Sequence, residues 1–154
     1  MGTTLYIALD QESVAIELNN DRVFLADLVS DHEAMAKLCH TLGVRSLSEF
    51  QSYDPELIGS FVEDKEARKL AIAKARPIEW FNPSDALSTI PALISHYETN
   101  RFIQERGQGR KVGGKIEWQP LDRTADLIRE LKDLEDVLSY AADHGVRFRL
   151  YIGF

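Results

Sequence analysis

The last nine residues, VRFRLYIGF, constrain the fold more than any other stretch, because apolar and polar side chains alternate through them without a break. The apolar side carries Val146, Phe148, Leu150, Ile152 and Phe154, and the other side carries Arg147, Arg149, Tyr151 and Gly153. A period of two residues predicts a strand with one buried face. Such a strand is poorly stable alone and needs a neighbour in a sheet.

The best neighbour for this strand lies at the other end of the chain. LYIALD, residues 5–10, is apolar on both sides, which is typical of a central strand. VAIEL, residues 14–18, predicts a second strand that pairs with it as a hairpin. We therefore expect the two ends of the chain to lie side by side in one sheet.

The segments between these strands carry helical signals. Helices are predicted over residues 31–42, 56–59 and 63–75, from residue 82 onward, and, with the clearest apolar face, over residues 121–145. Ser30 and Glu33 have the spacing of a capping box at the start of the first of these helices, and Gly43 suits its end. Pro91 predicts a kink or a restart in the fourth, because proline removes a backbone donor and crowds the carbonyl one turn earlier.

Length and element order together predict the fold class. A chain of 154 residues has the size of one domain, and its 44% hydrophobic content is enough for a sizeable core. Strands at the two ends with helices between them do not give the regular alternation of a doubly wound sheet. We predict a single α+β domain over residues 1–154, in which three to four helices cover a small antiparallel or mixed sheet that includes the N- and C-terminal strands.

Charge and cysteine content narrow the classes of partner and compartment. The net charge of −7 disfavours broad binding to nucleic acids or anionic membranes, since both depend on basic residues. The single cysteine allows no disulfide within the chain and fits a reducing compartment. No apolar run approaches the roughly 20 residues that span a membrane, and no basic segment precedes the first apolar run. We expect a cytoplasmic protein without a membrane partner.

The positive charge is concentrated in one glycine-rich segment at about residues 101–119. Residues 101–115 hold five basic residues and one acid, a local charge of +4 that leaves −11 for the rest of the chain. GRKVGGKI, residues 109–116, matches a phosphate-cradling loop up to its last letter, but Ile116 replaces the required hydroxyl residue. The flanking residues do not predict a buried strand before the glycines or a helix after them. We interpret the segment as a flexible, solvated glycine loop at the tip of a hairpin whose strands are residues 102–104 and 115–118.

The same segment is the best candidate for a binding surface. A tryptophan beside several cations is a typical composition for contacting anions, aromatic groups or another protein. The candidate binding residues are Arg106, Arg110, Lys111, Lys115 and Trp118.

Two further groups of residues are candidates for catalysis. Asp10, at the end of the first strand, could form a carboxylate pair with Glu12, although an acid there usually begins a turn. Cys39 could act as a nucleophile with His40 or His32, although a structural role for a lone cysteine is favoured. Ligands from a single helix do not complete a zinc site, so neither a metal nor a cofactor is expected.

Four segments of the chain resemble small bacterial proteins of uncharacterised function. These segments are MGTTLYIALD, LGVRSLSEFQS, EWFNPSDAL and the ending DLEDVLSYAADHGVRFRLYIGF. The resemblance implies a stand-alone bacterial cytoplasmic protein and carries no activity or catalytic motif.

Three functional hypotheses follow from the sequence. The leading one is a non-enzymatic protein-interaction or regulatory module, for example a toxin-neutralising partner, whose acidity steers it to a basic protein or which associates with itself. The second is a binder of small molecules, phosphate or nucleotides that uses residues 106–118. The third is a hydrolase built on the Asp/Glu or Cys/His candidates.

Overall fold

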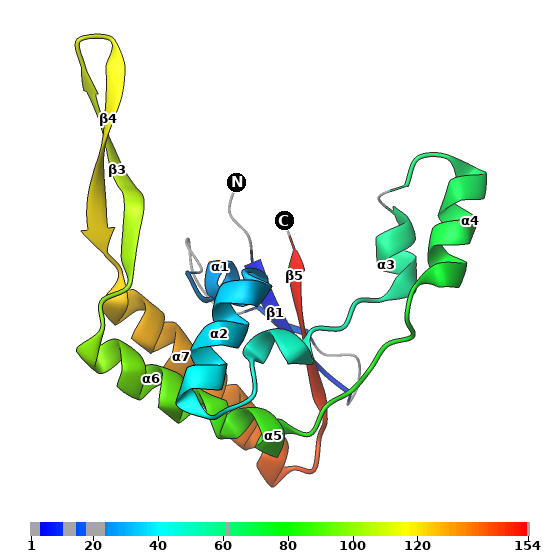
Figure 1. Cartoon of the computed structure of the whole chain (residues 1–154). Coiled ribbons are helices and arrows are strands. Elements are labelled where there is room, and N and C mark those ends of the chain that lie inside the picture. The colour runs from blue at the N-terminus through cyan, green and yellow to red at the C-terminus, as the bar shows by residue number, and fades with distance from the viewer. Residues whose placement is uncertain (1–3, 11–14, 18–23, 61, 154) are drawn as a thin grey trace.

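The two ends of the chain pair in a three-stranded antiparallel sheet, as the alternating pattern predicts (Figure 1). The computed structural model describes residues 4–10, 15–17, 24–60 and 62–153. Strand β1 (Thr4–Leu9) lies between β2 (Ala15–Glu17) and β5 (Phe148–Gly153), and its register with β5 runs from Thr4 opposite Gly153 to Leu9 opposite Phe148. The predicted α+β fold class is therefore confirmed, including the pairing of the terminal strands.

The outer edge of β5 is covered by two loop segments from the middle of the chain. Phe81 exchanges both backbone hydrogen bonds with Phe148, at 2.8 and 2.9 Å, and the amide of Ser52 donates to the carbonyl of Leu150 at 3.0 Å. The ring of Phe50 contacts the rings of both Phe81 and Phe148, edge-on to the first and tilted against the second. Because these contacts pair backbone groups of Phe148 and Leu150, β5 is held on both sides at these residues.

Helices form one layer against the sheet. The longest, α7 (Thr124–Asp143), runs directly into β5 and is joined in the core by α1 (Phe24–Ser30), α2 (His32–Leu42), α5 (Pro83–Leu87) and α6 (Thr89–Thr99). The buried face of α7 consists largely of the predicted apolar residues, namely Leu127, Leu131, Leu134, Leu138 and Ala141. The break between α5 and α6 falls at Ser88, directly after Leu87, whose carbonyl Pro91 would crowd. The predicted restart is thus confirmed, one turn before the proline.

The ends of the first helices differ in part from the capping prediction. Asp31, rather than Ser30, caps α2 by accepting a hydrogen bond from the amide of Ala34, whereas the hydroxyl of Ser30 donates to the carbonyl of Asp27 in α1. Asp31 is the N-cap residue because α1 continues through Ser30, so that Asp31 is the residue directly before α2. Gly43 closes α2 in the left-handed conformation, as predicted.

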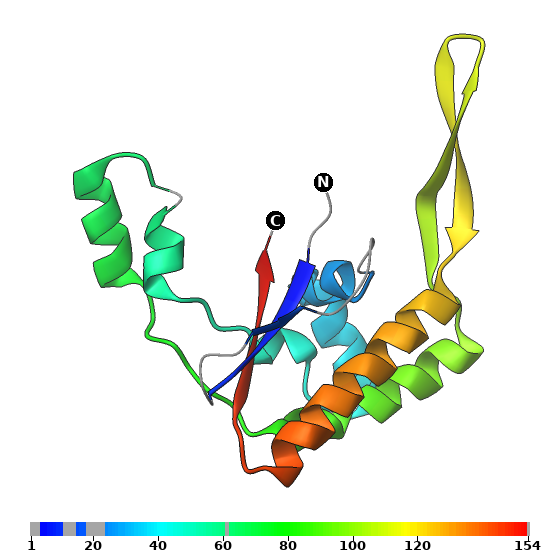
Figure 2. The same cartoon turned by 180° about the vertical axis from the view of Figure 1, so that it is seen from behind.

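Two parts of the chain project away from this body (Figures 1 and 2). A short helical turn, η1 (Leu47–Phe50), leads to the first projection, which consists of α3 (Pro55–Ser60) and α4 (Lys65–Lys74). None of the residues of α4 is buried. The second projection is a hairpin of β3 (Ile103–Val112) and β4 (Lys115–Asp122) that rises between α6 and α7.

We predict that Phe148→Ala destabilises the whole fold. The side chain is fully buried and contacts Phe50 and Phe81, so its removal leaves a cavity where sheet and loop segments meet. The expected loss is about 3–5 kcal/mol in the free energy of unfolding by urea, a large share of the roughly 5–15 kcal/mol typical of a domain. The control is Leu70→Ala on α4, where the side chain is 59% exposed and a change within about 0.5 kcal/mol is expected. Equal losses in the two variants would contradict this account of the core.

Candidate functional site

The hairpin of β3 and β4, residues 103–122, is called the arm below. Its strands pair in a regular antiparallel ladder from Val112 opposite Lys115 to Gln108 opposite Gln119, with an irregularity between Gln104 and Gln108. Gly113 and Gly114 form the turn at φ angles of 57° and 80°. Two consecutive residues with positive φ match the twist of a two-residue hairpin, and glycine reaches this conformation without strain.

The strands of the arm are longer than the sequence predicted. Residues 105–111, which the sequence places in the loop, lie in strand β3. Gly109 therefore lies inside a strand, and a second strand rather than a helix follows the glycines. A phosphate-cradling loop needs a helix at this point, so the arm does not have that geometry.

Apolar side chains are exposed along the arm. Of the six large hydrophobic residues exposed in the described part of the chain, four lie here, namely Ile103, Val112, Ile116 and Trp118. Trp118 is opposite Gly109 in the ladder, and a Cβ on Gly109 would lie 3.1 Å from the indole ring. The glycine thus leaves room for the tryptophan to lie against the opposite strand, while 47% of its surface stays open to solvent.

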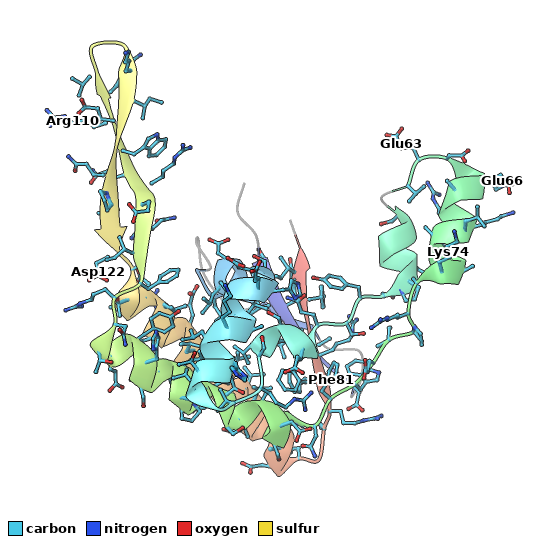
Figure 3. All side chains as sticks on the ribbon, in the orientation of Figure 1. Glu63, Glu66, Lys74, Phe81, Arg110 and Asp122 are labelled. Carbon is cyan, nitrogen blue, oxygen red and sulfur yellow. The ribbon has the colours of Figure 1, made fainter. Side chains whose placement is uncertain are left out.

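The distal part of the arm, residues 106–116, is called the arm tip below. It carries four cations, Arg106, Arg110, Lys111 and Lys115, and no acid. None of these cations has an ion pair among the residues that the structure describes. The guanidinium of Arg106 lies over the Trp118 ring, 5.8 Å from its centroid, and Arg110 points away from the ribbon in Figure 3. The tip therefore presents positive charge beside an open aromatic ring.

The base of the arm is tied to the first turn of α7. Thr124, which is 4% exposed, accepts a hydrogen bond from the amide of Phe102 at 2.8 Å and donates its hydroxyl to the carboxylate of Asp122. Asp122 also accepts from the backbone amide of Thr124 at 2.9 Å and contacts Arg101 at 3.3 Å. The hydroxyl of Thr124, its amide and the charge of Arg101 lower the pKa of Asp122. Only Arg123 separates β4 from α7, so the direction of the arm follows the helix.

The arm is an exposed two-stranded hairpin. It is one hairpin with two faces and two edges, and all residues from Gln108 to Pro120 are exposed. An isolated two-stranded hairpin is marginally stable in water and gains stability when a further strand or an apolar surface covers it. A partner that covers Trp118 and Ile116 would supply such a surface.

The two carboxylate candidates at the end of β1 are not seen together. Asp10 receives two hydrogen bonds from Arg147, one from the backbone amide at 2.9 Å and one from Nε at 2.8 Å, and its own amide donates to the Arg147 carbonyl at 3.0 Å. Its carboxylate thus extends the β1–β5 pairing by one residue. Glu12 lies outside the described residues.

The candidate cysteine belongs to the core. Cys39 is 1% exposed, its Sγ lies 3.5 Å from the Sδ of Met35, and burial raises the pKa of the thiol. A raised pKa disfavours the thiolate, which is the nucleophilic form.

The two candidate histidines line a hollow that does not include Cys39. His32 and His40 border an open hollow of about 400 Å³ together with Ser46, Ser48 and Glu49. The polar groups opposite the histidines are engaged in capping η1, where Glu49 accepts from the amide of Ser46 at 3.0 Å. Within the described ranges, no three His, Cys, Asp or Glu residues are grouped so that they could hold a metal ion.

Arg149 in β5 and Arg147, which directly precedes this strand, do not extend the basic surface of the arm. Arg147 pairs with Asp10, whereas Arg149 stacks on Trp80 and Tyr151 and donates to the carbonyl of Ser52 at 2.7 Å. Both residues stabilise the sheet and the loops beside it. The anchor at Asp122 and Thr124 was not predicted from the sequence, where its only signal is an acid two residues before a threonine at the start of a helix.

Comparison with known proteins gave no relative: no family model, curated protein or solved structure matched the chain. In the part of the chain that the structure describes, no helix is both long enough and apolar enough to cross a membrane. The arm therefore has to be interpreted from its own chemistry.

We predict that Thr124→Val raises the pKa of Asp122 toward its ordinary value of 3.8. The hydroxyl of Thr124 favours the ionised carboxylate, so without it the carboxyl takes up a proton at a higher pH. The backbone amide and Arg101 remain, so the change is partial. Carboxyl chemical shifts followed by NMR across acid pH measure it. The control is Thr99→Val, at the exposed end of α6, which should leave Asp122 unchanged. An identical titration in both variants would rule out the anchor.

Proposed function

We propose that this chain is a non-enzymatic protein-interaction module and that the arm is its docking element. The observation that carries the proposal is the exposure of Trp118, Ile116 and Val112 on a hairpin whose distal half contacts nothing else in the described chain. Aromatic residues and arginine are enriched at the centres of protein interfaces. Trp118 beside Arg106 fits that composition.

The energetics favour a protein surface as the partner of the arm. Covering one large apolar side chain contributes roughly 1.5–3 kcal/mol, and the arm offers two, Ile116 and Trp118, on one face of β4. The tip is cationic, so the surface that receives it carries acidic residues. This differs from the basic partner expected from net charge alone, because the charge of the arm is opposite to that of the body.

The cellular setting of the proposal rests on the sequence and the free cysteine. Cys39 is unpaired and buried, which supports a reducing compartment such as the cytoplasm. The resemblance to small bacterial proteins supports a bacterial regulatory partner, of which a toxin-neutralising protein is one form.

A photo-crosslinking experiment tests the docking function. Replacing Ile116, which is 60% exposed, by p-benzoylphenylalanine places a reactive group on the arm and leaves Trp118 intact. In the cells that naturally make the protein, irradiation should yield a discrete protein adduct. The same reagent at Leu70, which is 59% exposed on α4, serves as the matched control and should give none.

The adduct should depend on the chemistry of the arm. Adding Trp118→Ala to the labelled protein should reduce its yield several-fold, because the aromatic anchor is lost. Equal labelling from positions 116 and 70 would contradict the proposal. So would an adduct at position 116 that contains nucleic acid instead of protein.

The four unpaired cations favour one second candidate, a binder of phosphate or nucleotides at the arm tip. Phosphate or a nucleoside triphosphate should then raise the melting temperature, since a ligand of the folded state stabilises it. Arg110→Ala or Lys115→Ala should abolish the rise, and Lys69→Ala on α4 should not. No rise with any of these anions would remove this candidate and leave protein docking untouched.

A further inference from the structure

We propose that the arm docks on a second copy of this chain, with the tip of each arm lying along the C-terminal half of the other copy's α7. This inference rests on the proposed docking function and names its partner. The receiving surface, residues 133–143, is called the acidic half of α7 below.

The acidic half of α7 is negatively charged, whereas the arm tip is positively charged. It contains four acids, Asp133, Glu135, Asp136 and Asp143, and no lysine or arginine. None of them has an ion pair among the described residues. The arm tip holds four cations without an ion pair, and it remains positive with Glu117 opposite Arg110 in the ladder, so the two surfaces are opposite in sign.

The electrostatics of α7 itself favour a cation at this end. The C-terminus of a helix carries partial negative charge, which basic side chains usually offset. The last turn of α7 has no basic residue and contains Asp143. The acids therefore add to the negative end of the helix dipole, and cations from outside the helix would offset both.

The apolar groups of the two surfaces also correspond. Tyr140 is 53% exposed between Asp136 and Asp143 and stacks on His144, with ring centroids 4.1 Å apart. It is the only large hydrophobic side chain exposed on the body within the described residues, apart from the α4 projection and the arm. Trp118 on the arm has the guanidinium of Arg106 over its ring. An aromatic ring beside acids on the helix thus corresponds to an aromatic ring beside a cation on the arm.

The lengths of the two charged surfaces agree. From Arg106 to Lys111 a strand rises about 17 Å, at roughly 3.3 Å per residue. From Asp133 to Asp143 a helix rises about 15 Å, at roughly 1.5 Å per residue. The two charged surfaces therefore have similar lengths.

The arm points away from the acidic half of its own α7. It leaves the helix at Thr124, the opposite end from Asp143, and both views show it rising away from the body while α7 runs the other way (Figures 1 and 2). Contact with these acids therefore requires another molecule. If two copies exchange arms about a two-fold axis, the contact forms twice and the assembly closes as a dimer.

A charge exchange between two variants tests this inference. Arg110→Glu with Lys111→Glu reverses the arm, and Asp136→Lys with Asp143→Lys reverses the helix. Sedimentation equilibrium of the unchanged protein at low salt should show a dimer that weakens as salt is added. Each double variant alone should dimerise at least about tenfold more weakly, because both of its contacts join like charges.

Mixing the two variants gives the decisive result. In the mixed pair the reversed arm meets the reversed helix and the original arm meets the original helix, so dimer formation should return to near the original level. Recovery also shows that both variants are folded. A dimer that both double variants leave unchanged, or a mixture that stays monomeric, would overturn the inference.

The outcome separates this inference from the docking function on which it rests. If the unchanged protein is a monomer at all concentrations tested while Ile116-labelled protein still crosslinks to a different protein, docking stands and the second copy is rejected. If position 116 gives no protein adduct and the protein is monomeric, both fail.

Discussion

The pairing of β1 with β5 is the constraint on which the rest of the structure depends. It joins the two ends of the described chain, and the three hydrogen bonds between Asp10 and Arg147 extend it beyond the strands. Because α7 leads straight into β5, this pairing also fixes which face of α7 is buried. The segments at Ser52 and Phe81 then attach to the free edge of β5. Within the described chain, the two projections form no backbone hydrogen bonds of this kind with the sheet.

The sequence predicted the elements that have local sequence signals. It did not predict those that depend on contacts between residues far apart in the chain. Strands β1 and β5 and helix α7 followed from the arrangement of their apolar residues. The end of α2 at Gly43 and the start of α5 after Asn82 followed from the chemistry of helix ends. Helix α1 was missed, because its first turn is held by Glu130, whose carboxylate accepts from the amide of Leu25 across 105 positions. The bridges of Gln51 and Phe81 to β5 likewise depend on tertiary contacts that no local pattern encodes.

The candidate site shows the same division. Its residue types were readable, since a tryptophan among cations is visible in the sequence, but its extent was not. IQERGQGRKV has few of the residues that favour strands, and it forms one because KIEWQPLD pairs with it across a tight glycine turn. The anchor at Thr124 could not be predicted either, because its hydroxyl accepts from the amide of Phe102, 22 positions away, while it donates to the carboxylate of Asp122. The segment predicted to be a basic loop is therefore a paired hairpin that is anchored at its base.

The distribution of ion pairs explains how such an arm can be retained in a stable fold. The ion pairs of the described chain lie on the body or at the base of the arm, and none involves the arm tip or the acidic half of α7. Exposed pairs contribute little to stability, so leaving these charges unpaired costs the monomer little. These charges act during association, when separated patches of opposite charge attract and orient an approaching molecule. A hairpin already paired and anchored at Asp122 loses less conformational entropy on docking than a disordered loop would. Modest contacts along its length are then sufficient for binding.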